Sequence, residues 1–167
     1  MSRKISEGSP EMLGVTPDAR GVNVAVFSAN ATAIEFCLFD GEREIERIAL
    51  PERSGDVFYG HIEGVAPGAR YGLRAHGPFA PEAGHRFNAS KLLVDPYAKL
   101  LDRPFHLHQS MFAYQQAGNG FDATDSAPHM PKAIVTPADE AKSAHRPLTA
   151  WPHTILYELH VRGFAAG

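Results

Sequence analysis

The sequence of 167 residues contains one cysteine, one tryptophan and no long apolar run. The single cysteine, Cys37, excludes an internal disulfide and fits a reducing compartment. No segment has the length and hydropathy that a membrane span requires, and the two basic residues near the N-terminus are not followed by an apolar stretch. We therefore expect no membrane anchor and no signal peptide, and we predict a cytoplasmic location.

An excess of charge of one sign is also missing. The chain has 16 Lys and Arg against 19 Asp and Glu, a net charge of −3, and the basic residues form no block. A nucleic-acid partner is therefore not expected. The sequence also lacks a phosphate loop, a dinucleotide fingerprint, a nucleophile elbow and a CxxC pair, so we predict no cofactor.

Glycine and proline, in contrast, are abundant, with 15 and 13 residues, which favours many turns over long helices. Short segments rich in β-branched and aromatic residues follow one another, separated by turns such as Asp40-Gly41 and Pro67-Gly68. Within the first segment Val22, Val24 and Val26 alternate with other residues. This pattern predicts an immunoglobulin-like antiparallel β-sandwich. The predicted strands are residues 22–28, 34–39, 45–50, 57–62 and 70–75.

The pattern divides the chain into four parts. Residues 1–13 are polar and are expected to be flexible, and residues 14–76 carry the predicted strands. Residues 77–150 have little periodicity, which suggests a connector that packs against something larger. Residues 151–167 change character, because Thr154 to Val161 form a strand-like run without strict alternation. A strand that is apolar on both faces belongs in a covered parallel sheet or barrel, so we expect a further domain to begin there.

The stretch from residue 71 to residue 99 joins the predicted sandwich to the connector, and its charged and aromatic residues are expected to be structural. Arg86 lies between His85 and Phe87, and we interpret its guanidinium group as a support for an irregular loop rather than a ligand contact. Asp95 precedes a proline and Tyr97, which predicts a structural stop with Asp95 bonded to nearby N–H groups.

Three aromatic residues are candidates for sugar contact, because a pyranose ring stacks its C–H face on an aromatic ring. They are Tyr59, Tyr71 and Phe79, and the alternative is that they are core or interface aromatics. The only tryptophan, Trp151, lies outside the predicted sandwich, which disfavours strong sugar binding by the sandwich.

Catalytic and metal sites are not predicted. Glycoside hydrolysis needs two carboxylates held close together, and the acidic residues of this chain lie mostly at turns. His106 and His108 have a spacing that a metal can use on a strand, but no cysteine or acidic cluster completes such a site.

Four stretches of the sequence are similar to the N-terminal part of isoamylase-type glycogen debranching enzymes of the α-amylase superfamily. They are residues 21–40 (GVNVAVFSANATAIEFCLFD), 76–99, 127–132 (APHMPK) and 151–164 (WPHTILYELHVRGF). The resemblance implies that a sandwich of the carbohydrate-binding-module type precedes a (β/α)8 barrel. It also implies that residues 151–167 are the truncated start of that barrel, and that the parent enzyme hydrolyses α-1,6 branch linkages of glycogen or limit dextrin.

The family's catalytic carboxylates lie on later barrel strands, so no catalytic role is carried over to any residue of this chain. We therefore expect a fragment that is inactive alone, with the missing barrel and glycogen or another α-glucan as partners. Two alternatives stay open, a non-catalytic module that targets glycogen, and the front end of a branching enzyme or a maltooligosyl-trehalose hydrolase. Residues 84–99, GHRFNASKLLVDPYAK, favour debranching.

Overall fold

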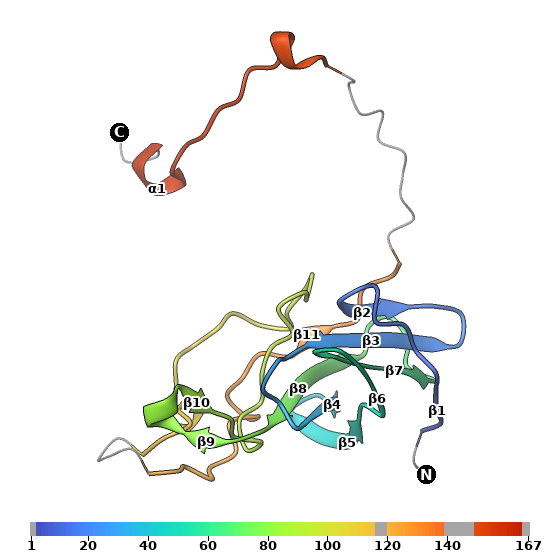
Figure 1. Cartoon of the computed structure of the whole chain (residues 1–167), viewed down its shortest axis with the longest axis vertical. Helices are drawn as coiled ribbons and strands as arrows, with labels where there is room; N and C mark the ends of the chain where they lie inside the picture. Colours follow the sequence, from blue (N-terminus) through green and yellow to red (C-terminus); the bar gives the residue numbers. More distant parts are fainter. Residues whose placement is uncertain (1–2, 116–119, 139–148, 165–167) are drawn as a thin grey trace.

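The fold is a sandwich of two antiparallel sheets, seen in a computed structural model that describes residues 3–115, 120–138 and 149–164 (Figure 1). Sheet A has the order β1 (Ile5–Ser6), β7 (Val57–Glu63), β3 (Gly21–Phe27), β2 (Gly14–Pro17), and β6 (Glu52–Ser54) also pairs with β7. Sheet B has the order β11 (Ala133–Ile134), β8 (Arg70–His76), β4 (Ala33–Asp40), β5 (Arg43–Ala49). The strands β9 (Phe79–Ala80) and β10 (His85–Arg86) form a separate ribbon.

Helical structure in the described residues is limited to single turns. They are η1 (Pro81–Ala83), η2 (Gln109–Met111), η3 (Trp151–His153) and α1 (Val161–Phe164). None of the helices described is long and apolar enough to cross a membrane.

The core lies between the two sheets and follows from the alternation of the strands. Val22 and Val24 of β3 are fully buried, and Phe36 of β4 belongs to the same cluster. Burying a side chain of this size stabilises the fold by about 1.5–3 kcal/mol before conformational entropy is subtracted. The five predicted strands correspond to β3, β4, β5, β7 and β8, so the predicted antiparallel β-sandwich is confirmed. The predicted turn at Asp40-Gly41 joins β4 to β5, with Gly41 at a positive φ of 60°.

The N-terminal arm, residues 3–13, is attached to sheet A, contrary to the prediction of a flexible end. Strand β1 pairs with β7. The side-chain amide of Asn23 makes two hydrogen bonds to the backbone of Ser9. Its Oδ1 accepts the Ser9 N–H at 2.7 Å, and its Nδ2 donates to the Ser9 carbonyl at 3.0 Å. The Ser6 hydroxyl also lies 3.2 Å from Nδ1 of His61. A strand of two residues has no periodicity to detect, so β1 was not predictable from the sequence.

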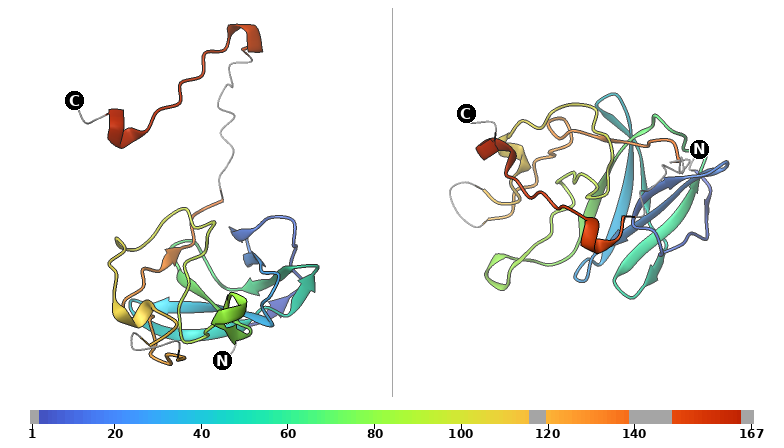
Figure 2. Two further views of the ribbon diagram at one scale, coloured as in Figure 1. Left: turned by 60° about the vertical axis from the view of Figure 1, so that its left-hand side comes forward. Right: turned by 90° about the horizontal axis from the view of Figure 1, so that it is seen from above.

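The outer face of sheet B is covered by the connector, which we define from here as residues 87–135. Cys37 and Phe39 alternate with the core residues of β4, yet both are buried in a second cluster with Leu92 and Ala127. Gly72 of β8 makes the close approach possible, since a Cβ at this position would lie 2.7 Å from Cδ1 of Leu92. In Figure 2 the connector runs from yellow-green to orange beside the strands of sheet B.

The apolar run at residues 92–94 therefore packs on this chain itself. Leu92 is 2% exposed, and Leu93 exchanges two backbone hydrogen bonds with Leu73 of β8, at 2.9 and 2.8 Å. Leu92 thus packs on the sandwich of this chain, whereas the Leu93 side chain remains 45% exposed. At this point the edge of β8 and the connector satisfy each other's backbone groups.

The tail, residues 149–164, does not contain the predicted strand. Residues 154–160 are extended without pairing, between the single turns η3 and α1 (Figure 2). Ile155, Leu156 and Tyr157 are each at least 76% exposed. A strand is stabilised by hydrogen bonds to a neighbouring strand, and no described residue pairs with this segment. The structure thus does not confirm a first barrel strand.

Candidate functional site

Tyr71 is a core residue and not a platform for sugar. It is 2% exposed, its ring stacks on Phe36 with the centroids 5.2 Å apart, and its hydroxyl donates to Asp95 Oδ2 at 2.8 Å. Burial, reinforced by the Asp95 carboxylate, raises the pKa of the Tyr71 phenol well above its ordinary value. No face of the Tyr71 ring is open to solvent, so the prediction that Tyr71 contacts sugar is wrong. The alternative, a core aromatic, holds.

The other two predicted aromatic contacts lie on different sheets. Tyr59 is half-buried on β7 of sheet A, opposite Ala25 of β3. Phe79 is half-buried on the ribbon strand β9. The structure does not bring these two side chains together.

Phe79 instead contacts an aromatic residue that the sequence did not single out. Its ring packs edge-to-face with Phe121, with the centroids 5.1 Å apart and an interplanar angle of 84°. Phe121 is 46% exposed and lines a hollow of about 230 Å³ together with Arg47, Ser90 and Asp125. We call this hollow the Phe121 hollow. Phe121 lies in a segment without periodicity, and no signal in the sequence pointed to it.

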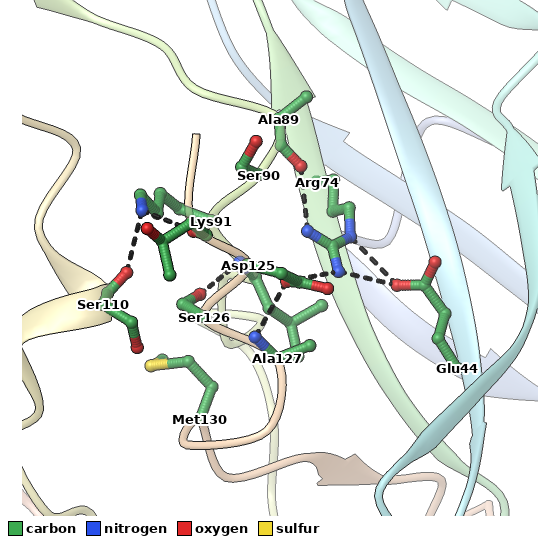
Figure 3. Close-up of polar contacts among 12 residues, drawn as sticks. Glu44, Arg74, Ala89, Ser90, Lys91, Ser110, Asp125, Ser126, Ala127 and Met130 are labelled. Atoms are coloured by element: carbon green, nitrogen blue, oxygen red, sulfur yellow. Dashed lines mark hydrogen bonds and ion pairs between the residues drawn. The ribbon is translucent and has the colours of Figure 1, made fainter. Parts of the chain in front are cut away.

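A buried arginine, Arg74, is among the residues that line the Phe121 hollow, and Figure 3 shows its hydrogen bonds. The Arg74 side chain is 1% exposed and uses its whole guanidinium fork. Nε and Nη2 donate to Glu44 Oε2 at 3.0 and 2.8 Å, and Nη1 donates to the Ala89 carbonyl at 2.9 Å. Nη2 also donates to Asp125 Oδ1 at 2.9 Å. Strand β8 therefore holds β5 and two parts of the connector through a single side chain.

The carboxylates of Glu44 and Asp125 determine the charge state of the hydrogen-bond network around Arg74. Burial alone would lower the pKa of Arg74, but its hydrogen bonds to Asp125 and Glu44 outweigh burial and raise it. For Asp125, burial would raise the pKa, but hydrogen bonds from the Ala127 N–H and from Arg74 leave it below its ordinary value. Both groups are charged at neutral pH. Asp125 is about half exposed, at 54%, so its carboxylate is available to hydroxyl groups of a ligand.

The residues that the sequence predicted to be structural between positions 85 and 97 differ in their surroundings, and Arg86 is exposed. His85 and Arg86 make up β10, and Phe87 packs against the main core. Asp95 is buried and accepts the N–H of Tyr97 at 2.8 Å, which confirms the predicted stop at this position.

Two buried lysines hold the connector, and neither was predicted from the sequence. Lys91 Nζ donates to the carbonyls of Ser110 and Thr124, at 2.9 and 2.6 Å. Lys132 Nζ donates to the carbonyls of Ala127 and Met130, at 2.5 and 2.7 Å, and lies 5.1 Å from the centroid of the Phe39 ring. Burial lowers the pKa of Lys132. Because lysine is normally an exposed residue, the sequence alone does not indicate that Lys91 and Lys132 are buried and bonded to the connector backbone.

The histidines considered for metal binding do not come together. His106 is exposed, whereas the ring of His108 stacks on His129, with the centroids 3.5 Å apart. Within the described parts of the chain, no three His, Cys, Asp or Glu side chains are grouped so that they could hold a metal ion.

Known proteins resemble this chain over most of its length. A glycogen debranching enzyme of Yersinia enterocolitica is 44% identical over 160 residues, which is 95% of this chain and 24% of that enzyme. One of Pectobacterium atrosepticum is 42% identical over 161 residues, again 24% of its length. The chain therefore spans about a quarter of the curated relatives that it matches.

Solved structures give more distant likenesses. The catalytic module of the glycogen-degrading pneumococcal virulence factor SpuA matches 77% of this chain, and 17% of its own, with a TM-score of 0.49 and 16% identity. A pullulanase from Bacillus acidopullulyticus matches 57% of this chain and 11% of its own, with a TM-score of 0.46 and 14% identity. The assignment to a family therefore rests on sequence.

The family model for carbohydrate-binding module 48, described as the isoamylase N-terminal domain, matches residues 12–98. These residues include β2 to β10 and are more than half of the chain. Together with the two-sheet sandwich and the resemblance of the motifs, this match shows that the chain belongs to the carbohydrate-binding module 48 (isoamylase N-terminal domain) family.

Proposed function

We propose that this chain is the glucan-contacting N-terminal module of a glycogen debranching enzyme, in which a separate catalytic domain hydrolyses α-1,6 branch linkages. The family, and relatives that are named glycogen debranching enzymes, support the substrate class. The observation that carries the contact site is the Phe121 hollow. It combines an exposed aromatic ring with charged side chains already fixed in place, which suits a ligand with an apolar ring face and many hydroxyl groups.

Affinity gel electrophoresis in glycogen tests this proposal. We expect the mobility of the chain to fall as glycogen is added, and Phe121→Ala to abolish most of the retardation. Phe105→Ala is the matched control, because Phe105 is also an exposed phenylalanine, at 55%, and does not line the hollow. Wild-type mobility that is independent of glycogen would contradict the proposal. Equal retardation of wild type and Phe121→Ala would remove the Phe121 hollow as the site.

We also propose that this chain has no hydrolytic activity of its own and docks on the catalytic domain through the connector. Exposed apolar side chains of the connector support the docking surface, since Tyr97, Phe105 and Leu107 are each more than half exposed. The relatives extend well beyond the length that this chain covers, which supports a neighbouring domain as the occupant.

Co-purification tests the docking. The chain is produced with the remaining part of the Yersinia enterocolitica relative as a separate polypeptide. We expect the two to co-purify and to release reducing sugar from limit dextrin only when mixed. The double variant Phe105→Asp/Leu107→Asp should lose co-purification. Reducing sugar released by the chain alone, or co-purification that the double variant leaves unchanged, would contradict the proposal.

A further inference from the structure

A second hollow, of about 260 Å³, adjoins the same segment of the connector and has not yet been assigned a role. It is lined by Tyr114 and by hydrogen-bonding side chains that include His108, Gln109 and Asp122. We call it the Tyr114 hollow. Its size is below that of a site for a drug-sized ligand and suits one small ring.

The two hollows are linked by a pair of aromatic residues. The N–H of Gln115 donates to the Gly120 carbonyl at 2.8 Å, and the N–H of Asp122 donates to the Ala113 carbonyl at 3.1 Å. These two bonds enclose Tyr114 and Phe121, which are bridge partners, as a non-hydrogen-bonded antiparallel pair. Side chains of such a pair project from the same face of the backbone and are the closest cross-strand neighbours. Tyr114 and Phe121 therefore project from the same face of this short antiparallel pair, and each lines one of the two hollows.

The polar groups of the Tyr114 hollow are held in place before any ligand arrives. His108 Nδ1 accepts the N–H of Ser110 at 3.2 Å, so the proton of the neutral ring is on Nε2, and stacking on His129 fixes the ring plane. Asp122 Oδ1 accepts the Thr124 N–H at 2.7 Å and Lys91 Nζ at 3.3 Å. Hydrogen bonds from Thr124, and then Lys91, lower the pKa of Asp122. The hollow thus offers a fixed donor and an ionised acceptor.

The chemistry of the lining favours a neutral, hydroxyl-rich ligand. A phosphate or carboxylate would face the Asp122 carboxylate, and the one lysine nearby already donates to Asp122 and to two carbonyls. A donor and an acceptor close to an exposed tyrosine ring match the vicinal hydroxyls and the C–H face of a sugar unit. Tyr114 is 38% exposed, so part of its side chain is open to solvent.

We propose that the Tyr114 hollow is a second sugar subsite, so that a linear glucan lies across Tyr114 and Phe121 with one sugar unit in each hollow. This inference rests on the proposed glucan-contacting function and adds a path and a minimum ligand length to it. The affinity for malto-oligosaccharides then rises when the ligand becomes long enough to reach both hollows.

Calorimetric titration with maltose, maltotriose and maltohexaose tests this path. Wild type should bind maltohexaose more tightly than maltose. Tyr114→Ala should remove most of that gain, weakening maltohexaose binding about fivefold while maltose binding changes little. Tyr114→Phe keeps the ring and should restore the gain. Tyr97→Ala, an exposed tyrosine that lines neither hollow, is the control.

The results distinguish failure of the second subsite from failure of the proposed glucan-contacting function. If Phe121→Ala loses binding while Tyr114→Ala keeps the full length dependence, the second subsite is wrong and the proposed function stands. If no malto-oligosaccharide and no glycogen binds to wild type, both are wrong. Unfolding midpoints of all variants, measured in parallel, show that any loss comes from the site and not from the fold.

Discussion

The connector and the tail both lack long strands, yet parts of the connector are buried against the sandwich, whereas the tail is exposed. The connector contains two lysines, Lys91 and Lys132, that are at most 5% exposed. The tail is strongly apolar and strand-forming, yet Tyr157 is 86% exposed. The difference lies in the partners, since the outer face of sheet B offers carbonyls, carboxylates and an apolar cluster to the connector, and no described residue pairs with the tail. Burial in this chain follows from available partners and not from hydrophobicity alone.

The largest expected effect is at the residue that joins the connector to sheet B. Arg74→Ala should lower the free energy of unfolding by about 3 kcal/mol, because it leaves Glu44 and Asp125 without their common cation and removes four hydrogen bonds. Urea unfolding at pH 7 measures this. Arg74→Lys keeps the positive charge but not the planar guanidinium group, so it should lower the free energy of unfolding by less than Arg74→Ala. A loss below about 1 kcal/mol for Arg74→Ala would mean that the network does not hold the connector.

A matched pair of leucines tests whether the connector is part of the domain core. Leu92→Ala should cost about 3 kcal/mol, since the side chain is buried against Gly72 and the cluster around Cys37. Leu93→Ala changes an exposed side chain and should cost no more than about 0.5 kcal/mol. The two free energies of unfolding come from the same urea titrations. Similar values for the two variants would contradict the observed packing.

Asp125 should make the connector sensitive to acid. Folding lowers the pKa of Asp125, so its contribution to stability is present at pH values above about 4, the unfolded pKa, and is lost as the pH falls further. Asp125→Asn should therefore cost about 1 kcal/mol or less at pH 7 and still less at pH 3. Asp40→Asn removes the same charge at an exposed turn and should have no effect at pH 7. If the loss of stability caused by Asp125→Asn increased towards pH 3, the predicted pH dependence would be wrong.

The smallest effect is expected for removal of the tail. A chain ending at residue 150 should unfold with a free energy within about 0.5 kcal/mol of the full chain, because residues 151–160, 163 and 164 are exposed. It should also be more monodisperse in light scattering, since an unpaired apolar strand-forming segment favours association. A shorter chain that is less stable, or no more monodisperse, would show that the tail packs on the sandwich.

Strands that alternate strictly were predictable from the sequence, and elements defined by their partners were not. The alternation of Val22, Val24 and Val26 gave the position of β3, and the turn at Asp40-Gly41 gave the end of β4. The two-residue strands β1 and β9 have no period. The strand predicted at Thr154 to Val161 is not confirmed, because intrinsic preference does not supply the neighbouring strand that a sheet requires.

The candidate site was predicted only in part. The sugar contact predicted for Phe79 stays a prediction, since Phe79 is half-buried and lines neither hollow, while the contact predicted for Tyr71 is wrong because alternation along β8 places Tyr71 in the core. Phe121 and Tyr114 lie in a segment without periodicity, and only the folded connector brings them together. The motifs identified the family, but the arrangement of side chains that supports glucan contact depends on contacts between residues distant in sequence.

Native-state hydrogen exchange compares the connector and the tail most directly. The amides of Leu93, Ser126 and Val135, which donate to the carbonyls of Leu73, Ser90 and Ala69, should exchange only through global unfolding, with the same free energy as the amides of β4. The amides of residues 155–159 should exchange at the rates of an unstructured peptide. If the connector amides exchange as fast as those of the tail, the connector is not part of the folded domain, and the central claim is wrong.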